Sequence, residues 1–375
     1  MRKYVVLMLL VCFVVAQPLM AGAKFDLGND AKLSLGGLVQ VQNGWNKSYN
    51  TKSSSVRRAR VKMVYDYKDL LSVVTQTEVG ASSGGRSLKL IDAYAVLKLN
   101  KNIHIYNGMH LAPANRQNIT SSAVLMGIDR PGVVYKSQSW GGTGKGVFNS
   151  VSIGSGGLIN EVGVRDNGVT LFGQDSFNAE THIKYYLGVY NGNKGYSDSG
   201  ERITGRVQVN LKDAEAGYYC KSTYLGEKDT VAFGLSYDLQ PNAKGVVNST
   251  TYIADYKYVS LDVFAEKPLA NGTISIEGAY STLDLGDTYK VAEGKGYYLQ
   301  VGYYMPEFNA QPWLVYENWQ ADAEAGDYSA VKLGGTYFLN GNSLNIKAGI
   351  EKFMPSASSG LADTYSGMCG IYAAF

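Results

Sequence analysis

The sequence predicts a large all-β protein, and three observations support this fold class. The chain has 375 residues, among them 44 Gly and 29 Tyr, whereas Gly normally makes up only about 7% of a protein. So much Gly, Tyr and β-branched residue disfavours a helical bundle. Apolar residues reach 45% of the chain, which is too high for an intrinsically disordered protein. Past the N-terminus, no apolar run approaches the roughly 20 residues that a transmembrane helix requires.

Residues 1–23 are interpreted as a signal peptide. Arg2 and Lys3 form a positive start, an apolar stretch follows them, and small residues at positions 21–23 match the cleavage pattern of such peptides. An N-terminal membrane anchor is the alternative, but the apolar stretch is short for a span. We therefore expect an exported protein with a single domain over residues 24–375.

The charge balance and the cysteine content exclude several classes of function. Lys and Arg number 35 against 32 Asp and Glu, so the overall charge predicts no nucleic-acid partner, and any electrostatic function must be local. Apart from Cys12 of the signal peptide, the chain has Cys220 and Cys369, which do not form a disulfide framework. No pair of His or Cys stands at metal-ligand spacing, and no G-x-S-x-G motif is present. We expect no metal, no cofactor and no enzymatic activity.

The rest of the chain consists of short alternating segments, separated by turn clusters such as Asn271-Gly272 and Asn340-Gly341-Asn342. Each segment has a length close to the 9–11 residues or so with which a tilted strand crosses a bilayer. At about 22 residues for each strand with its connection, the chain accommodates about 16 strands, enough for a barrel with an aqueous channel. The strand candidates are 32–42, 56–66, 88–99, 182–190, 203–211, 231–237, 273–280, 296–304, 331–339, 343–352 and 366–375.

The alternation fits two kinds of β protein. In segment 88–99, Asp92, Tyr94 and Lys98 share one face, and the opposite face is apolar. A soluble β-sandwich turns its apolar face inward, whereas a membrane barrel turns it to lipid and lines a wet lumen with polar residues. A secreted β-sandwich or adhesin without a pore is therefore an alternative. In a barrel, Asp92, Tyr94 and Lys98 are candidate lumenal residues.

Two features favour the barrel. Segment 366–375 reads as a strand that ends on Phe375, and a terminal aromatic resembles the signal read by the bacterial barrel assembly machinery. Tyr residues recur near strand ends, as in the aromatic girdles of membrane barrels. We expect the bacterial outer membrane as the location, with its lipid and the assembly machinery as partners. The Tyr residues in question are Tyr65, Tyr67, Tyr185, Tyr186, Tyr218, Tyr219, Tyr297, Tyr298, Tyr303, Tyr304 and Tyr337.

The densest positive feature lies in segment 56–66. Arg58, Arg60 and Lys62 share one face of the predicted strand, and each would cost roughly 2–4 kcal/mol at mid-depth in hydrocarbon. We therefore expect them to line the lumen as a basic ladder that attracts anions. Arg57 has the opposite phase, and we expect it near the membrane interface. The alternative is that the cations pair with lumenal acids such as Glu78 and serve only the structure.

Segment 111–130 has no clean alternation. A loop of about 20 residues is uncommon unless it has a function, and one that folds into a barrel narrows the pore. Arg116 and Arg130 are the candidate residues of such a constriction.

Several segments together resemble the phosphate-selective porin O and P family. The resemblance implies a usually trimeric outer-membrane channel of 16 strands, with an arginine ladder on the wall and the third loop folded into the pore. On this chain it maps the ladder to Arg58 and Arg60, continued by Lys62, and the constricting loop to about 111–129. The segments are VRRARVKMVYDYKD, LIDAYAVLKL, GMHLAPANRQNITSSAVLMGIDRP, RDNGVTLFG and YYLGVYNG, with weaker similarity in RITGRVQVNL and YLGEKDTVAFGLSY.

The chain departs from this family in one respect. Phosphate-selective members carry lysines in the inward loop, whereas this chain has no Lys between Lys101 and Lys136. We therefore expect a homotrimeric porin whose water-filled channel passes small hydrophilic solutes by diffusion, with a broad preference for small anions. A non-selective small-solute porin is the alternative within this class.

Overall fold

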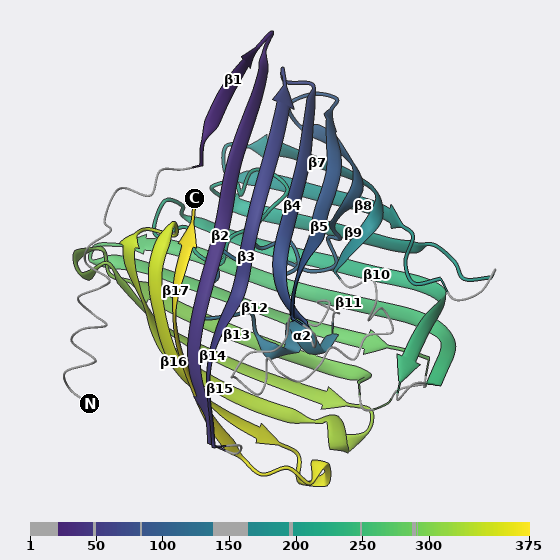
Figure 1. Cartoon of the computed structure of the whole chain (residues 1–375), viewed down its shortest axis with the longest axis vertical. Helices are drawn as coiled ribbons and strands as arrows, with labels where there is room; N and C mark the ends of the chain where they lie inside the picture. Colours follow the sequence, from purple (N-terminus) through teal and green to yellow (C-terminus); the bar gives the residue numbers. More distant parts are fainter. Residues whose placement is uncertain are drawn as a thin grey trace.

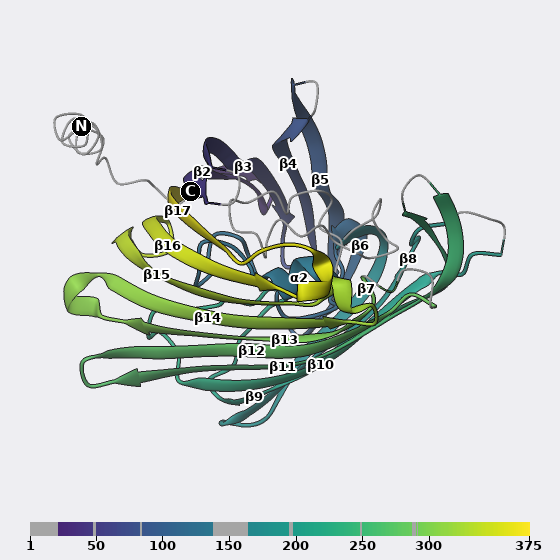
Figure 2. The ribbon, with the colours of Figure 1, turned by 90° about the horizontal axis from the view of Figure 1, so that it is seen from below.

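The computed structural model describes residues 22–47, 50–82, 85–137, 164–194, 198–247, 250–286, 290 and 292–375. Residues 1–21 of the expected signal peptide lie outside this set. In the described part of the chain, sixteen strands, β2 to β17, form a closed antiparallel sheet in which β17 pairs with β2. Figures 1 and 2 show the resulting barrel. The predicted fold class and strand number are confirmed.

Each strand candidate from the sequence falls on a strand of the barrel, and a short additional strand, β1, pairs with β2. No helix among the described residues is long and apolar enough to cross a membrane. A short helix, α2 (Gly132–Ser137), lies between β6 and β7, and connections contain the 3-10 turns η1 (Pro306–Phe308), η2 (Glu324–Gly326) and η3 (Ala357–Ser359). The strands are β1 (Lys24–Gly28), β2 (Ala31–Asn46), β3 (Thr51–Tyr67), β4 (Leu71–Ser82), β5 (Gly85–Lys98), β6 (Ile103–Leu111), β7 (Arg165–Asn178), β8 (Thr181–Tyr190), β9 (Arg202–Lys212), β10 (Thr230–Val247), β11 (Thr250–Leu269), β12 (Gly272–Asp284), β13 (Gly294–Tyr304), β14 (Ala310–Ala321), β15 (Tyr328–Asn340), β16 (Leu344–Pro355) and β17 (Thr364–Ala374).

The barrel carries apolar side chains on the outside and polar side chains on the inside. In β11, Val259 and Leu261 are exposed, whereas their neighbours Ser260 and Asp262 are buried. A soluble sandwich would show the reverse arrangement, so the pattern is that of a barrel with a lipid-facing outer surface. Other exposed apolar side chains of the strands are Val61, Val207, Phe233, Leu299, Leu314, Leu333 and Ile350.

Residues 112–137, called the inward segment below, leave β6 and fold into the barrel. Nearly all of its side chains are buried, and both figures show α2 within the ring of strands. Met126 and Ile128 pack with Trp313 of β14 and Tyr372 of β17. Lys347 of β16 donates hydrogen bonds to carbonyl oxygens of the segment, with a distance of 2.9 Å to that of Gly127. The expected inward-folded loop is present, and it contacts widely separated parts of the wall.

The expectation that paired Tyr residues form two girdles is wrong at several positions. Tyr297 is 42% exposed, but its neighbour Tyr298 is only 4% exposed. Successive side chains of a strand point to opposite faces, so only one member of such a pair can face lipid. Tyr186 is likewise buried inside the barrel. Tyr218 and Tyr219 lie between β9 and β10 rather than on a strand.

The outer surface leads to a prediction for Leu261, which is 55% exposed on β11. Leu261→Lys should destabilise the folded barrel in a bilayer by about 2–4 kcal/mol, the cost of a lysine on the lipid face near mid-depth. Urea titration of the protein folded in lipid vesicles, followed by the migration of unboiled samples on gels, measures this change.

Leu361→Lys is the matched control, because Leu361 is 60% exposed and lies in the connection between β16 and β17. This variant should unfold at nearly the same urea concentration as the wild type. Equal unfolding of all three proteins would show that Leu261 does not face hydrocarbon.

Candidate functional site

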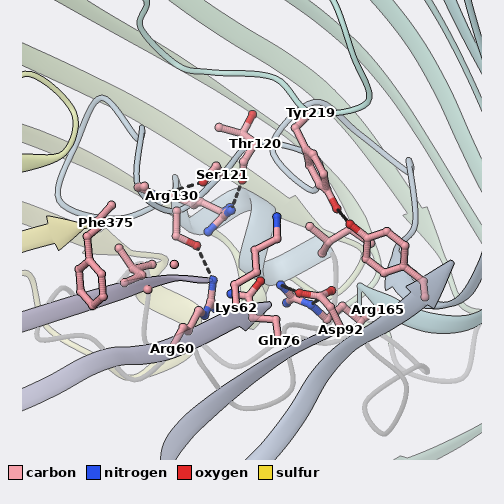
Figure 3. A pocket seen from close by; sticks show the side chains of 18 residues that line it. Arg60, Lys62, Gln76, Asp92, Thr120, Ser121, Arg130, Arg165, Tyr219 and Phe375 are labelled. Carbon is pink, nitrogen blue, oxygen red and sulfur yellow. Dashed lines mark hydrogen bonds and ion pairs between the residues drawn. The ribbon is translucent and has the colours of Figure 1, made fainter. Parts of the chain in front are cut away.

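A cavity of ≈210 Å³ lies inside the barrel, between the inner wall of β2 to β5 and the inward segment. Its lining contains four cationic side chains, whereas Asp92 is the acidic side chain among the lining residues. Figure 3 shows these groups together with hydroxyl groups from the inward segment. The lining residues are Gly36, Gly37, Leu38, Arg60, Lys62, Gln76, Asp92, Tyr94, Leu111, Thr120, Ser121, Ser122, Ala123, Arg130, Arg165, Tyr219, Ala374 and Phe375.

Lys62 lies on β3 and extends into this cavity (Figure 3). Its side chain is half-buried, and within the described residues it forms no hydrogen bond or ion pair. The acid whose charge acts on Lys62 is Asp92. The Lys62 ammonium group is therefore the cation of the cavity that is best placed to interact with a solute.

Arg60, two residues earlier on β3, faces the same cavity but is compensated. Its Nε donates a hydrogen bond to Oε2 of Glu78 on β4, and its Nη1 donates to Oγ of Ser122, 3.1 Å away. The Arg60 side chain is only 8% exposed. Arg60 thus joins the wall to the inward segment, in keeping with the alternative in which such cations pair with acids and serve the structure.

Asp92 and Tyr94 of β5 both line the cavity, and each contacts a residue that the sequence did not suggest as part of the site. Arg165, the first residue of β7, donates a hydrogen bond from Nε to Oδ1 of Asp92 at 2.8 Å. The hydroxyl groups of Tyr94 and Tyr219 lie 3.0 Å apart. Arg165 follows a long segment without alternation, and Tyr219 is not on a strand, so periodicity offered no signal for either.

Lys98 does not join this site. It is the last residue of β5, and its Nζ lies 3.5 Å from Oδ1 of Asp66 near the end of β3. Its side chain is about one quarter exposed, and it is not among the residues that line the cavity.

Arg58 and Arg57 both point inward and contact Asp129 of the inward segment. The distance from Arg58 Nη2 to Oδ1 is 3.1 Å, and that from Arg57 Nε to Oδ2 is 2.7 Å. The expectation that Arg57 lies at the membrane interface is therefore wrong. The reason is a β-bulge: Gln40 pairs with Arg58 and Val41 pairs with Val56, which leaves Arg57 as an extra residue.

This contact has a strong electrostatic basis. Burial raises the pKa of the Asp129 carboxyl group, but the charges of Arg57 and Arg58 outweigh this effect and hold the pKa well below its usual value. The hydroxyl group of Tyr135 also donates a hydrogen bond to Asp129, at 2.6 Å. Arg58 is thus an anchor of the inward segment rather than a lining residue of the cavity.

The structure separates the two constriction candidates. Arg130 lines the cavity and donates a hydrogen bond from Nε to the carbonyl oxygen of Gln117 at 3.1 Å. Arg116 does not reach the cavity. It is fully buried and forms two hydrogen bonds, of 2.8 and 2.6 Å, with the carboxylate of Glu215.

No group of three or more His, Cys, Asp or Glu side chains in the described ranges is arranged to hold a metal ion. The cavity presents cationic and hydroxyl groups, with Asp92, on a mixed polar and apolar surface.

No family model matches the chain, and no curated protein matches its sequence. Solved structures of bacterial outer-membrane porins are similar in fold. The anion-selective porin from Comamonas acidovorans has a TM-score of 0.58 at 14% identity, covering 92% of this chain and 100% of that one. The outer-membrane channel DcaP of Acinetobacter baumannii has a TM-score of 0.56 at 11% identity, with coverage of 95% and 100%. OmpF of Salmonella typhi, in a complex with daunomycin, has a TM-score of 0.56 at 11% identity, with coverage of 94% and 100%. At these identities, the similarity establishes that the chain shares the fold of bacterial outer-membrane porins.

Proposed function

We propose that this protein is an outer-membrane porin whose channel passes small hydrophilic solutes by diffusion and prefers anions. The observation that carries the proposal is the lumenal cavity with Lys62 at its wall and with more basic than acidic side chains in its lining. A cation in a lumen with low-dielectric walls raises the local concentration of anions. The porin from Comamonas acidovorans, which shares this fold, is anion-selective, and this agrees with the proposed preference.

The cavity favours a broad anion preference over a specific phosphate site. Tight phosphate binding needs several charged donors that are free to contact the ligand. Here Arg60 is engaged by Glu78, Arg165 by Asp92, and Arg130 by backbone carbonyl oxygens of the inward segment. The Lys62 side chain has no hydrogen-bond or ion-pair partner among the described residues. We therefore propose that the chain resembles the phosphate-selective porin O and P family in its barrel and inward-folded loop, but not in a selectivity for phosphate.

We also propose a homotrimer and a non-enzymatic role. One similar structure is a trimer form of OmpT, an outer-membrane protein of Vibrio cholerae. The Oγ of Ser176 lies 2.7 Å from Nδ1 of His182, but the other ring nitrogen of His182 contacts the backbone carbonyl oxygen of Lys212 instead of a carboxylate. A base oriented by a carboxylate, as in hydrolases with a catalytic triad, is therefore missing from this pair.

Lys62→Glu should shift the selectivity of the channel toward cations, because it replaces an ammonium group that extends into the cavity by a carboxylate close to Asp92. The reversal potential in a KCl gradient across a planar bilayer measures the shift. Lys101→Glu is the control, since Lys101 is exposed in the turn between β5 and β6, and it should change the reversal potential less. An unchanged potential for Lys62→Glu would contradict the proposed pore wall.

Asp92→Asn should move the reversal potential in the opposite direction, toward stronger anion preference. The amide can still accept a hydrogen bond from Arg165, while the charge that opposes Lys62 is removed. Asp66→Asn is the matched control, because Asp66 contacts Ser72 and Lys98 outside the cavity. An equal effect of the two substitutions would show that Asp92 has no special place in the solute path.

Added phosphate should block the chloride current only weakly, because Lys62 would have to hold the phosphate largely alone. The measurement is the single-channel chloride current at increasing phosphate concentration. Block at phosphate concentrations far below that of chloride would contradict the broad preference and indicate a phosphate site.

A further inference from the structure

The connections at one mouth of the barrel are uniformly short, with one exception. Because the strands are antiparallel, the turns after β3, β5, β7, β11, β13 and β15 lie at the same mouth as the C-terminus. In the described residues, the turns at this mouth have two to five residues, whereas residues 213–229, between β9 and β10, number 17. The inward segment enters from the opposite mouth. We call residues 213–229 the second segment.

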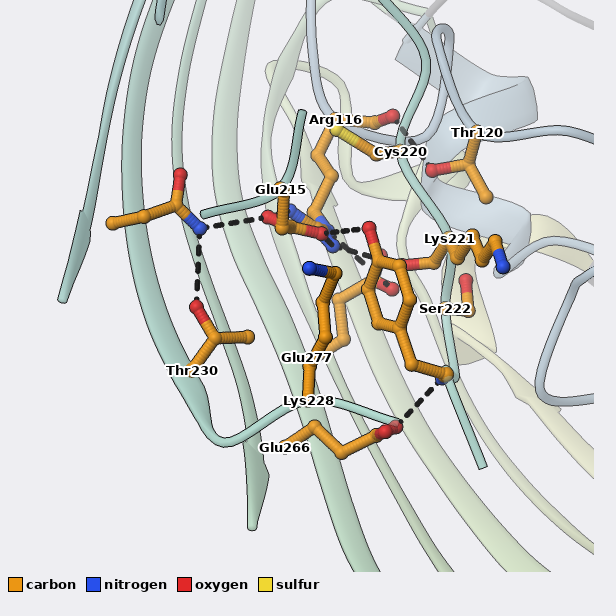
Figure 4. A network of polar contacts seen from close by, with 12 residues as sticks. Arg116, Thr120, Glu215, Cys220, Lys221, Ser222, Lys228, Thr230, Glu266 and Glu277 are labelled. Atoms are coloured by element: carbon orange, nitrogen blue, oxygen red, sulfur yellow. Dashed lines mark hydrogen bonds and ion pairs between the residues drawn. The ribbon is translucent and has the colours of Figure 1, made fainter. Parts of the chain in front are cut away.

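The second segment reaches the inward segment inside the barrel (Figure 4). Glu215 accepts both hydrogen bonds from Arg116, and Arg116 also donates to the carbonyl oxygen of Lys221 at 2.8 Å. Thr120 and Cys220 form a parallel β-bridge. The two segments are thus joined both by an ion pair and by backbone contact.

Arg116 is held between the second segment and the barrel wall. Its guanidinium carbon lies 4.0 Å from the centre of the Phe264 ring of β11, and its Nε lies 3.9 Å from Oε2 of Glu277 on β12. The side chains of Arg116, Glu215 and Glu277 are all fully buried. Burial raises the pKa of Glu215, but the charge of Arg116 outweighs it, so this carboxyl group is held well below its usual pKa and stays ionised.

The second segment is itself anchored independently of Arg116. The Glu266 carboxylate of β11 accepts hydrogen bonds from the backbone nitrogens of Tyr224 and Gly226, at 2.8 and 2.9 Å. Tyr218 packs against the aromatic side chains Tyr106 and Tyr186 of the wall. The second segment is therefore a fixed support to which the inward segment is attached.

We propose that the second segment is a positioning element of the channel, in which Glu215 holds Arg116 and so keeps the inward segment against β11 and β12. The solute path is thereby confined to the opposite side of the lumen, along β2 to β5, where Lys62 lies. This inference rests on the proposed porin function, since it assigns the element that sets the width of that pore. Glu215 acts through Arg116 and does not contact the solute.

Glu215→Gln tests this role. Gln keeps the size of the side chain but removes the charge that compensates Arg116, so the inward segment should leave its position part of the time. We expect a higher single-channel conductance with frequent transitions between current levels. Glu227→Gln is the matched control in the same segment. Glu227 is largely exposed, and its ion pair with Lys221, with 3.8 Å between Oε2 and Nζ, is open to solvent. Its channel should behave like the wild type.

A disulfide provides the rescue experiment. Thr120→Cys places a thiol opposite the native Cys220 at the β-bridge, where paired backbones are close enough for a disulfide. Cys369→Ala removes the other described thiol, which lies exposed on β17. In a chain that also carries Glu215→Gln, oxidation by copper phenanthroline and oxygen should restore the steady conductance of the chain that carries Thr120→Cys and Cys369→Ala alone, and dithiothreitol should abolish the rescue. A merely structural role of Glu215 would not produce this reversible response.

The outcomes separate the two proposals. A wild-type protein that folds but conducts no ions contradicts the porin function. A conducting wild type with an unchanged Glu215→Gln channel, or a variant that oxidation does not restore, overturns the role of the second segment. If Glu215→Gln does not fold, the chain with Thr120→Cys and Cys369→Ala still decides. It should oxidise readily, and its oxidised and reduced forms should have the same conductance. Failure to form the disulfide, or a changed conductance on oxidation, overturns the inference.

Discussion

The interior of this barrel depends on the contact between Asp129 and two arginines of β3. All three side chains are almost fully buried, and removing one partner of a buried ion pair typically costs about 3–5 kcal/mol. Arg57 takes part only because the bulge in β3 turns its side chain inward. The bulge and the aspartate together fix where the inward segment crosses the lumen. Closer to Lys62, the hydrogen bond from Arg60 to Ser122 joins the same segment to β3.

Compensation of charge explains why the total charge of the chain says so little about its selectivity. Arg206 is paired with Asp262, Arg202 with Asp238, and Lys332 with Glu317, all on the inner wall. Such pairs contribute little net field at a distance, because the opposite charges cancel beyond a few ångströms. The charge that a solute meets is therefore set by the few groups whose compensation is incomplete. In the cavity, Lys62 is such a group.

The architecture could be predicted from the sequence, because the bilayer imposes the same two requirements on every strand. Each strand must be long enough to cross it, and each must alternate apolar side chains that face lipid with polar side chains that face the lumen. The sequence was insufficient where this alternation is broken. A single bulge turns the side chain of Arg57 to the opposite face of β3. Pro312 made β14 hard to predict, because proline is rare within sheets. Arg165 follows a long segment without alternation, and Glu215 lies in the connection after β9, where the alternation of the strand has ended. Whether a basic residue such as Arg116 is free or paired depends on contacts across about 100 residues of chain, which local spacing does not encode.

The two segments that fill the lumen are held in place by different means. A connection as long as the second segment loses much conformational entropy when it is held in one conformation. Glu266 and the aromatic residues of the wall offset that loss for the second segment. The inward segment instead depends on partners at two points along its length: Arg116 is held by the second segment, and Asp129 by β3. In the proposed channel, the width of the solute path can change without any change in the barrel, because the inward segment is held by the buried ion pairs of Asp129 and Arg116.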